Sequence, residues 1–335
     1  MRTRPILSII IPLYNTEKYI AQCLRSILED GILENGAMEL IVIDDGSTDA
    51  SGDIVRSLQE DFRQIKYHRQ PNQGVSSARS FGAQAAEGDF LWFIDSDDYL
   101  VPGAVRRIVD LIQSDPGLDL IAIPLLVQYD NGHHYVTPTY PAIEYDLVTP
   151  GKELLKRGFR IICPQQFILR KSLFFKEGVF FPKGIRYEDE YFSRVVQYYA
   201  AHTQALKDYL YVYRQWPGSF MNSAQVESVN YLVAVYKQLS TFAAEHVSAE
   251  DQNWFRRNIV SFLLETHTRF LEQVDSDAFR LFRKQYLPFI KQEFNACKSF
   301  FPKKERFLAS VLLDHPRFYS AVFTRYNTVK TWFRR

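Results

Sequence analysis

The first third of the chain alternates between short apolar runs and longer segments whose apolar residues recur at helical spacing. Residues 6–11 are β-rich and apolar on both faces, which is typical of a central strand in a parallel sheet. The next apolar residues follow the i, i+4, i+7, i+8 pattern of an amphipathic helix, at Ile20, Leu24, Ile27 and Leu28. The alternation continues through residue 123, with strands at 39–43, near 65–68 and at 90–94, and helices at 51–60, 75–86 and 105–112. This order predicts a doubly wound, mostly parallel α/β sheet with helices on both faces.

The pattern changes after residue 124. Residues 127–136 predict a hairpin around Asn131-Gly132. Further on, the sequence predicts a helix at 151–158, a helix at 191–201 and a strand at 205–213, and from about residue 222 it is helical in pattern throughout. We therefore expect one domain over residues 1–221, with parts at 1–124 and 125–221, and a helical C-terminal region over 222–335.

Three polar segments directly follow predicted strands: Pro12-Leu13-Tyr14-Asn15, Asp44-Asp45-Gly46-Ser47-Thr48-Asp49 and Asp95-Ser96-Asp97-Asp98. In doubly wound sheets, ligands bind beyond the carboxyl ends of the strands, so these segments should converge on one crevice. Neither a G-x-G-x-x-G fingerprint nor a P-loop follows the first strand, which argues against a Rossmann-type dinucleotide site and a P-loop nucleotide site.

The Asp-x-Asp spacing of Asp95 and Asp97 offers carboxylate oxygens, which suit a hard ion such as Mg²⁺ or Mn²⁺. The alternative is an acidic loop in which Asp98 caps the next helix. Asp44 and Asp45 could accept N–H bonds from a nucleobase edge. A turn followed by a helix cap at Ser47 or Thr48 is the competing interpretation.

Gly74 precedes a helix of small residues in which Arg79 is a candidate for a ribose or diphosphate contact, and an ordinary surface arginine is the alternative. Glu188-Asp189-Glu190 lies before a predicted helix, where the macrodipole alone would favour acids. A metal-assisted displacement, however, needs a second carboxylate centre to act as a base. The loop from Arg214 to Ser219 could close over a ligand or form a rigid surface turn.

Composition narrows the class of protein. The net charge of +1 over 335 residues gives no electrostatic footprint for nucleic acid, which we exclude as a partner. The three cysteines lack metal-type spacing, so reduced thiols in a cytosolic protein are expected. No apolar run approaches the ~18 residues of a membrane span.

Taken in this order, the motifs resemble those of an inverting family 2 glycosyltransferase with the GT-A fold, of the type that builds bacterial cell-surface polysaccharides. The resemblance covers residues 5–220. It rests on the segments 8–15, 41–49, 72–79 and 93–98, with looser fits at Glu188-Asp189 and at 213–219.

The resemblance implies a nucleotide-sugar donor, expected to be a UDP-sugar, bound by the 1–124 part, and Mn²⁺ or Mg²⁺. The donor site would comprise Pro12, Tyr14, Asn15, Asp44, Asp45, Gly74, Arg79, Asp95, Ser96, Asp97 and Arg214. Within it, Pro12, Tyr14 and Asp45 would surround the base, and Asp97 would bind the metal with the help of Asp95. The general base would be Asp189, or failing that Glu188, in a single displacement that inverts the anomeric configuration.

By the same resemblance the acceptor is a hydroxyl of a glycan or lipid-linked glycan, bound by the 125–221 part. The sequence lacks the transmembrane helices and the Gln-x-x-Arg-Trp signature of processive members, so one sugar would be added at a time. The aromatic and basic residues between Phe318 and Arg335 could lie on the inner face of the membrane, or pack against the catalytic domain. A sugar nucleotidyltransferase and a non-catalytic nucleotide- or carbohydrate-binding protein remain the alternatives.

Overall fold

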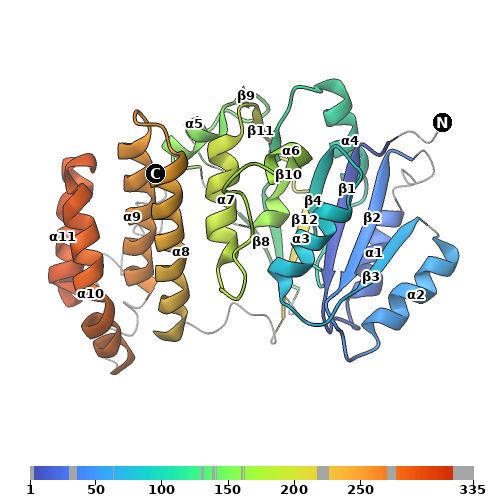
Figure 1. The fold of residues 1–335 in the computed structure, drawn as a ribbon, viewed down its shortest axis with the longest axis horizontal. Helices are drawn as coiled ribbons and strands as arrows, with labels where there is room; N and C mark the ends of the chain where they lie inside the picture. Colours follow the sequence, from blue (N-terminus) through green and yellow to red (C-terminus); the bar gives the residue numbers. More distant parts are fainter. Residues whose placement is uncertain are drawn as a thin grey trace. The chain divides into compact units, whose positions relative to one another are not determined.

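The N-terminal strands form one eight-stranded sheet in the order β3-β2-β1-β4-β10-β6-β11-β9 (Figure 1). The computed structural model describes residues 4–29, 36–62, 64–129, 132–137, 140, 142–159, 161, 163–216, 226–269 and 277–319. The chain divides into an N-terminal unit, Met1–Gly184 with Glu188–Ser219, and a C-terminal unit, Ile185–Tyr187 with Phe220–Arg335.

The apolar runs of the sequence become the central strands of this sheet. β1 (Leu7–Leu13) pairs in parallel with β2 (Met38–Asp44) and with β4 (Phe90–Phe93), and β2 pairs in parallel with β3 (Ile65–Arg69). All seven residues of β1 and all seven of β2 are buried, which explains why their sequences are apolar without alternation. β10 (Phe167–Arg170) runs antiparallel between β4 and β6 (Leu120–Ala122).

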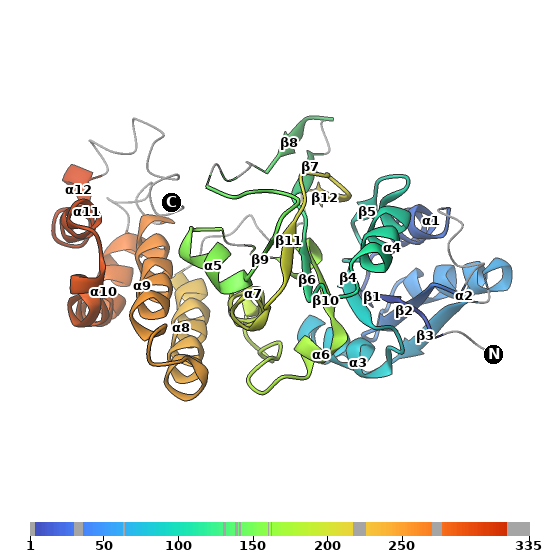
Figure 2. The same ribbon diagram turned by 90° about the horizontal axis from the view of Figure 1, so that it is seen from above.

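Helices cover both faces of the sheet, as predicted. α1 (Ile20–Leu28) and α4 (Ala104–Ser114) lie on one face and α3 (Val75–Ala85) on the other (Figure 2), and α2 (Ser51–Asp61) packs beside α1. The approach of α3 depends on Gly82, because a Cβ atom there would come within 2.3 Å of Ile10 Cγ2. The fold class predicted from the sequence is confirmed.

A second, four-stranded sheet has the order β5-β12-β7-β8. Its strands are β5 (Tyr99–Leu100), β7 (Leu125–Tyr129), β8 (His134–Val136) and β12 (Tyr211–Gln215). β7 and β8 pair antiparallel as the predicted hairpin requires, although Asn131 in its turn lies outside the described residues.

The prediction of one strand over 205–213 is wrong. β11 (Thr203–Ala205) belongs to the large sheet and pairs with β6 and with β9 (Val148–Thr149), whereas β12 belongs to the small sheet. Leu206 and Leu210 in the connection are buried. Between these two leucines lie Lys207, Asp208 and Tyr209, and this polar interruption is where the chain passes from one sheet to the other.

α7 (Glu188–Tyr199) begins earlier than predicted, and the acidic run forms its first turn instead of preceding it. The other short elements of this unit are α5 (Gly151–Lys156), the 3₁₀ helix η2 (Pro164–Gln166) and α6 (Lys171–Phe174). Phe93 of β4 contacts the rings of Phe174, Phe181 and Phe192 at centroid distances of 5.3–6.2 Å, and this aromatic cluster packs α6 and α7 against the sheet.

The C-terminal unit is helical, as the pattern after residue 222 predicted. It contains α8 (Val226–His246), α9 (Gln252–Arg269), α10 (Asp277–Cys297), η5 (Lys298–Phe300), α11 (Lys303–Asp314) and α12 (Pro316–Tyr319). No described helix is both long and apolar enough to cross a membrane. Of the aromatic and basic residues near the C-terminus, Tyr319 is buried and those from residue 320 onward lie outside the described part of the chain.

Candidate active site

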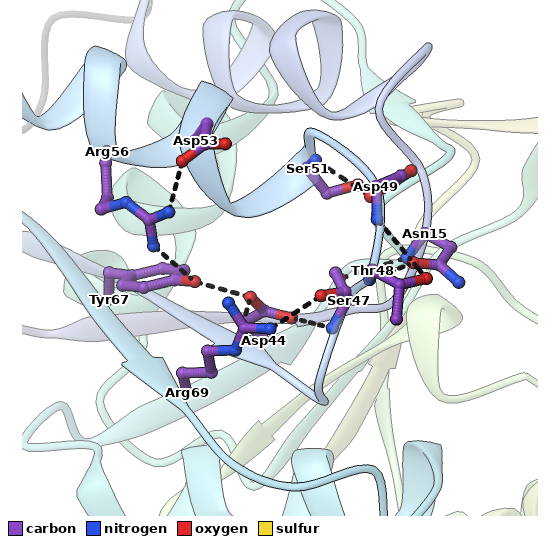
Figure 3. Close-up of polar contacts among 10 residues, drawn as sticks. All are labelled: Asn15, Asp44, Ser47, Thr48, Asp49, Ser51, Asp53, Arg56, Tyr67 and Arg69. Atoms are coloured by element: carbon purple, nitrogen blue, oxygen red, sulfur yellow. Dashed lines mark hydrogen bonds and ion pairs between the residues drawn. The ribbon is translucent and has the colours of Figure 1, made fainter.

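The loops that follow β1 and β2 are joined by hydrogen bonds, as the predicted convergence of strand ends requires. Asn15 adopts a left-handed conformation (φ 51°), and its Oδ1 accepts from Thr48 N at 2.8 Å while its own N–H donates to Ser47 Oγ at 3.2 Å (Figure 3). The expected helix cap at Ser47 or Thr48 is wrong, because α2 has Ala50 at its N-cap with no side-chain capping bond. These side chains bond to the neighbouring loop instead.

Asp44 is fully buried beneath this pair of loops. Its Oδ1 accepts from Ser47 N at 2.7 Å and its Oδ2 from the Tyr67 hydroxyl at 2.6 Å, with Arg69 Nε 3.8 Å away (Figure 3). Burial alone would raise the pKa of the Asp44 carboxyl, but these hydrogen bonds and the arginine outweigh it and the pKa is lowered. The ionised carboxylate of Asp44 therefore holds the loop after β2 in place through these hydrogen bonds.

Asp45 is buried and holds the segment before α3. Its Oδ1 accepts from Gln70 Nε2 at 2.7 Å and from Gln73 N at 2.9 Å, and its Oδ2 accepts from Gly74 N at 2.7 Å. Gly74 has φ 86°, a conformation that side chains rarely tolerate, although there is open space around it. The predicted residues Asp45 and Gly74 thus form one unit. Beside them Pro12 is buried, and the Tyr14 ring is 47% exposed.

The loop after β4 brings its carboxylates to the same edge of the sheet. Asp95 Oδ1 accepts from Arg79 Nη2 at 2.9 Å, its Oδ2 accepts from Gln165 Nε2, and its N–H donates to the Tyr211 hydroxyl at 3.2 Å. Ser96 Oγ accepts from Thr16 Oγ1 at 3.0 Å, which ties this loop to the one after β1. Both oxygens of Asp95 are thus held in place by the protein.

Asp97 and Asp98 have different partners. Asp97 Oδ2 accepts from Trp216 Nε1 at 3.0 Å, whereas Asp98 Oδ1 accepts from Arg214 N at 2.8 Å and its Oδ2 accepts from the Tyr211 hydroxyl. Burial, together with the neighbouring carboxylates, raises the pKa of both side chains. The prediction that Asp98 caps the following helix is wrong, because α4 begins at Ala104 with Gly103 at its N-cap. Asp98 instead anchors β12.

Arg214 lies against the Asp97 backbone. Its Nε donates to Asp97 O at 2.9 Å, and its guanidinium lies 4.9 Å from the centroid of the Tyr19 ring and 5.2 Å from that of Tyr99. Arg214 thus contacts the acidic loop after β4, and its contact with a donor stays a prediction. Ser219, the far end of the loop considered as a lid, lies outside the described residues.

Arg79 is buried, so the alternative of a surface arginine is wrong. Its Nη2 contacts Asp95, its Nη1 donates to Glu188 Oε1 at 2.9 Å, and its guanidinium lies 5.4 Å from the centroid of the Phe181 ring. Burial by itself would lower the pKa of the guanidinium, but the charges of Asp95 and Glu188 raise it above its usual value. One buried cation therefore links the loop after β4 to the first turn of α7.

Asp189 is half-buried beside Glu188, and its Oδ1 accepts from Glu190 N at 2.9 Å. Burial, followed by the charges of Glu188 and Glu190, raises the pKa of Asp189 well above the usual range of a carboxyl. Burial also raises the pKa of the Cys163 thiol, as do the nearby charges of Asp189 and Asp95. Glu188, the neighbour of Asp189, bonds to the same arginine as Asp95, which brings the first turn of α7 close to the loop after β4.

The donor set at this edge fits a metal ion that is shared with a ligand. Among the described residues, no group of three or more His, Cys, Asp or Glu side chains is arranged to hold a metal ion. Both oxygens of Asp95 accept hydrogen bonds from side chains, whereas Asp97 Oδ2 accepts one from the side chain of Trp216. Mg²⁺ is commonly bound by one or two carboxylates together with substrate phosphates, and the arrangement suits that mode.

Several residues of this site were not predicted. Gln165, Tyr211 and Trp216 each bond to one of the carboxylates after β4, and Gln70 bonds to Asp45. Trp216 lies in a segment that the sequence had marked as a possible lid. Gln165 comes from η2, in a stretch without clear periodicity, and nothing in its local sequence indicated a role.

Comparison with known proteins gives consistent matches. The sequence model described as Glycosyl transferase family 2 matches residues 8–176. The chain is 30% identical over 219 residues to a Bacillus subtilis protein named Uncharacterized glycosyltransferase EpsJ, and that match covers 64% of this chain but only 62% of the relative. It is 29% identical over 231 residues to Glycosyltransferase GlyG of Streptococcus pneumoniae, covering 65% of this chain and 73% of the relative.

A solved structure with a similar fold is the crystal structure of residues 1–349 of Staphylococcus aureus TarS in complex with UDP-GlcNAc. The TM-score is 0.58 at 20% sequence identity, and the alignment covers 84% of this chain and 91% of the TarS chain. At this level of identity the likeness concerns the fold.

Proposed function

This chain belongs to glycosyltransferase family 2, and we propose that it transfers one sugar from a UDP-sugar to a hydroxyl of a glycan or lipid-linked glycan in the synthesis of a bacterial surface polysaccharide. The fold supports this proposal, because it matches the GT-A arrangement expected for the family. The glycosyltransferase names of the relatives support the class of reaction, and the UDP-GlcNAc in the TarS crystal supports the class of donor.

The base-binding end of the donor site is the pair of loops after β1 and β2. Asp45 and the 70–74 segment form a wall of hydrogen-bonding groups, and the exposed ring of Tyr14 offers a flat surface for stacking. Asp44 and Asn15 keep these loops together from below. We infer that the base lies between Tyr14 and Asp45, and that Asp45 exchanges one of its present partners for an N–H of the base.

The diphosphate end is the acidic loop after β4. Asp97 would hold Mn²⁺ or Mg²⁺ through its carboxylate, and the bound ion would offset the charge that develops on the departing diphosphate. Asp95 acts beside it as a carboxylate whose orientation is fixed by Arg79 and Gln165. Arg214 adds a cation whose position is fixed by the aromatic rings on which it lies.

Asp189 is the proposed general base. Arg79 engages the carboxylate of Glu188 and Arg194 engages that of Glu190, which leaves Asp189 as the acid of the first turn of α7 that can take the proton of the acceptor hydroxyl. A base works best when its pKa is near the working pH, and the surroundings of Asp189 raise its pKa in that direction. A single displacement assisted by this base would invert the anomeric configuration.

The observation that carries the proposal is the bridge made by Arg79. Through its two ion pairs, both at 2.9 Å, this side chain connects the carboxylate loop that would bind the diphosphate to the turn that carries the proposed base. A metal-assisted displacement requires two such carboxylate centres close together.

The test is incubation of the full-length protein with Mn²⁺ and a panel of UDP-, GDP- and CMP-sugars, with glycan and lipid-linked acceptors. We expect turnover of a UDP-sugar, loss of transfer in Asp97→Asn, and retained UDP binding without transfer in Asp189→Asn. Asp110→Asn, an exposed acid on α4, is the matched control and should behave as the wild type.

Donor binding without turnover by the wild type would contradict the proposal in favour of a non-catalytic binding protein. Release of pyrophosphate from a nucleoside triphosphate and a sugar phosphate would instead identify a sugar nucleotidyltransferase. Transfer that persists in Asp189→Asn would refute the assignment of the base.

A further inference from the structure

The C-terminal unit contains a surface hollow where the start of α10 meets the junction of α11 and α12. Its volume is about 470 Å³, and its lining comprises Phe279, Arg280, Arg283, Asp314, His315, Pro316 and Arg317. Small-molecule sites commonly occupy about 300–1,000 Å³, so the hollow is larger than a simple inorganic ion requires.

The charge of the lining is predominantly positive. Three arginines face a single carboxylate, Asp314. That carboxylate lies 2.5 Å from Lys291 Nζ, so its charge is already engaged outside the lining. Arg280 forms an ion pair with Asp277, in which both side chains are largely exposed, and such surface pairs exchange readily with other ions.

Arg283 is the least satisfied cation of the lining. Its Nη2 donates to Leu313 O at 3.1 Å and its guanidinium lies 5.8 Å from the centroid of the Phe279 ring, but its Nη1 is buried without an acceptor among the described residues. Burial lowers the pKa of this guanidinium, against the opposing effect of Asp314. A cation that has lost water without gaining full compensation is stabilised by an added anion.

We propose that this hollow binds a phosphate group carried by the acceptor. Arginine guanidinium groups present forked donors that match phosphate oxygens, and three of them around one hollow exceed what a carboxylate ligand would need. The sugar, polyol or lipid attached to the phosphate would fill the remaining volume beside Phe279 and Pro316. Calling the ligand an acceptor rests on the proposed function, whereas phosphate binding itself does not.

Calorimetric titration of the full-length protein with inorganic phosphate and with glycerol 3-phosphate tests the soluble source of this chemistry. Sedimentation with phosphatidylglycerol vesicles, compared with phosphatidylcholine vesicles, tests a lipid headgroup. We expect saturable binding in at least one arm, with affinity reduced roughly tenfold or more in Arg317→Gln and in Arg283→Gln, as befits loss of a charge-assisted hydrogen bond.

Arg317→Gln changes an exposed side chain, so this variant still tests the site if Arg283→Gln fails to fold. Arg256→Gln, an exposed arginine of the same unit outside the hollow, is the control and should bind as the wild type does. Absence of saturable binding in both arms, or equal affinity in all variants, would overturn the proposal. UDP-sugar turnover is measured in parallel, so that failure of this site and failure of the proposed function give different results.

Discussion

Replacing Arg79 by glutamine removes the cation that lies between Asp95 and Glu188. The side chain of Arg79 is 5% exposed, and those of Asp95 and Glu188 are 25% and 14% exposed, so water can compensate the two remaining carboxylates only in part. Removing one partner of a buried ion pair costs about 3–5 kcal/mol. We expect Arg79→Gln to lower the free energy of unfolding of the N-terminal unit by that amount.

A double-mutant cycle with Glu188→Gln isolates the energy of the Arg79–Glu188 pair. Arg79→Gln leaves two uncompensated carboxylates, and adding Glu188→Gln removes one of them, so the double variant should be more stable than the two single effects predict. We expect a coupling energy of about 1–3 kcal/mol. Arg107→Gln breaks an ion pair to Asp208 in which both side chains are over 40% exposed, and it should cost at most about 1 kcal/mol.

Hydrogen–deuterium exchange of peptides from β1 and β4 measures the opening of the N-terminal unit separately from the C-terminal helices. Additivity of the two substitutions within about 0.5 kcal/mol would refute the bridge. So would an Arg79→Gln effect no larger than that of the exposed control.

The free protein should lose stability as the pH rises from about 4 through the raised pKa of Asp98, because the folded state then binds more protons than the unfolded state; Asp98→Asn should flatten this slope in urea titrations at several pH values. Gly82→Ala should destabilise the N-terminal unit by about 1–3 kcal/mol, since its Cβ meets Ile10, and a reversible melting curve that matches the wild type would contradict this. Mn²⁺ together with UDP should raise the melting temperature of the wild type but not of Asp97→Asn, as judged by calorimetry. Trp216→Phe, which keeps an aromatic side chain but loses the bond to Asp97, should weaken Mn²⁺-dependent turnover, and an unchanged Mn²⁺ titration of the rate would exclude that role.

Features that depend only on residues adjacent in the sequence were predictable from it. The buried strands are apolar without interruption, and polar residues directly after a strand lie at its end by construction, so the convergence of Tyr14, Asp45 and Asp97 on one edge followed from the topology. The split between β11 and β12 was missed although Lys207 and Asp208 interrupt the apolar pattern, because β11 is only three residues long and Leu206 and Leu210 of the connection are buried as strand residues are.

Side-chain contacts between residues far apart in the chain could not be predicted from local sequence patterns. Arg79 and Glu188 are 109 residues apart, and an arginine in a helix carries no sign of whether its guanidinium meets water or a buried acid. Asp98 looked like a helix cap because acids before a helix commonly are, yet the acceptors of its carboxylate are filled by β12, 116 residues away. Tertiary contacts decided these roles.

The dependence of the loop after β4 on later parts of the chain has a consequence for synthesis. Arg79 is made before this loop and bonds to Asp95, but the other partners of its three carboxylates are Gln165, Tyr211 and the 214–216 segment, none of which exists when β4 leaves the ribosome. At about 5–20 residues per second, the 116 residues between Asp98 and Arg214 take roughly 6–23 s to be made. During that interval β1, β2 and β3 can already pair. The carboxylates of the loop after β4 lie close together and still lack these later partners. The parallel strands of the nascent protein would therefore pair before the acidic loop has its partners. A chaperone or a counterion bound at that edge would stabilise the chain most during this interval.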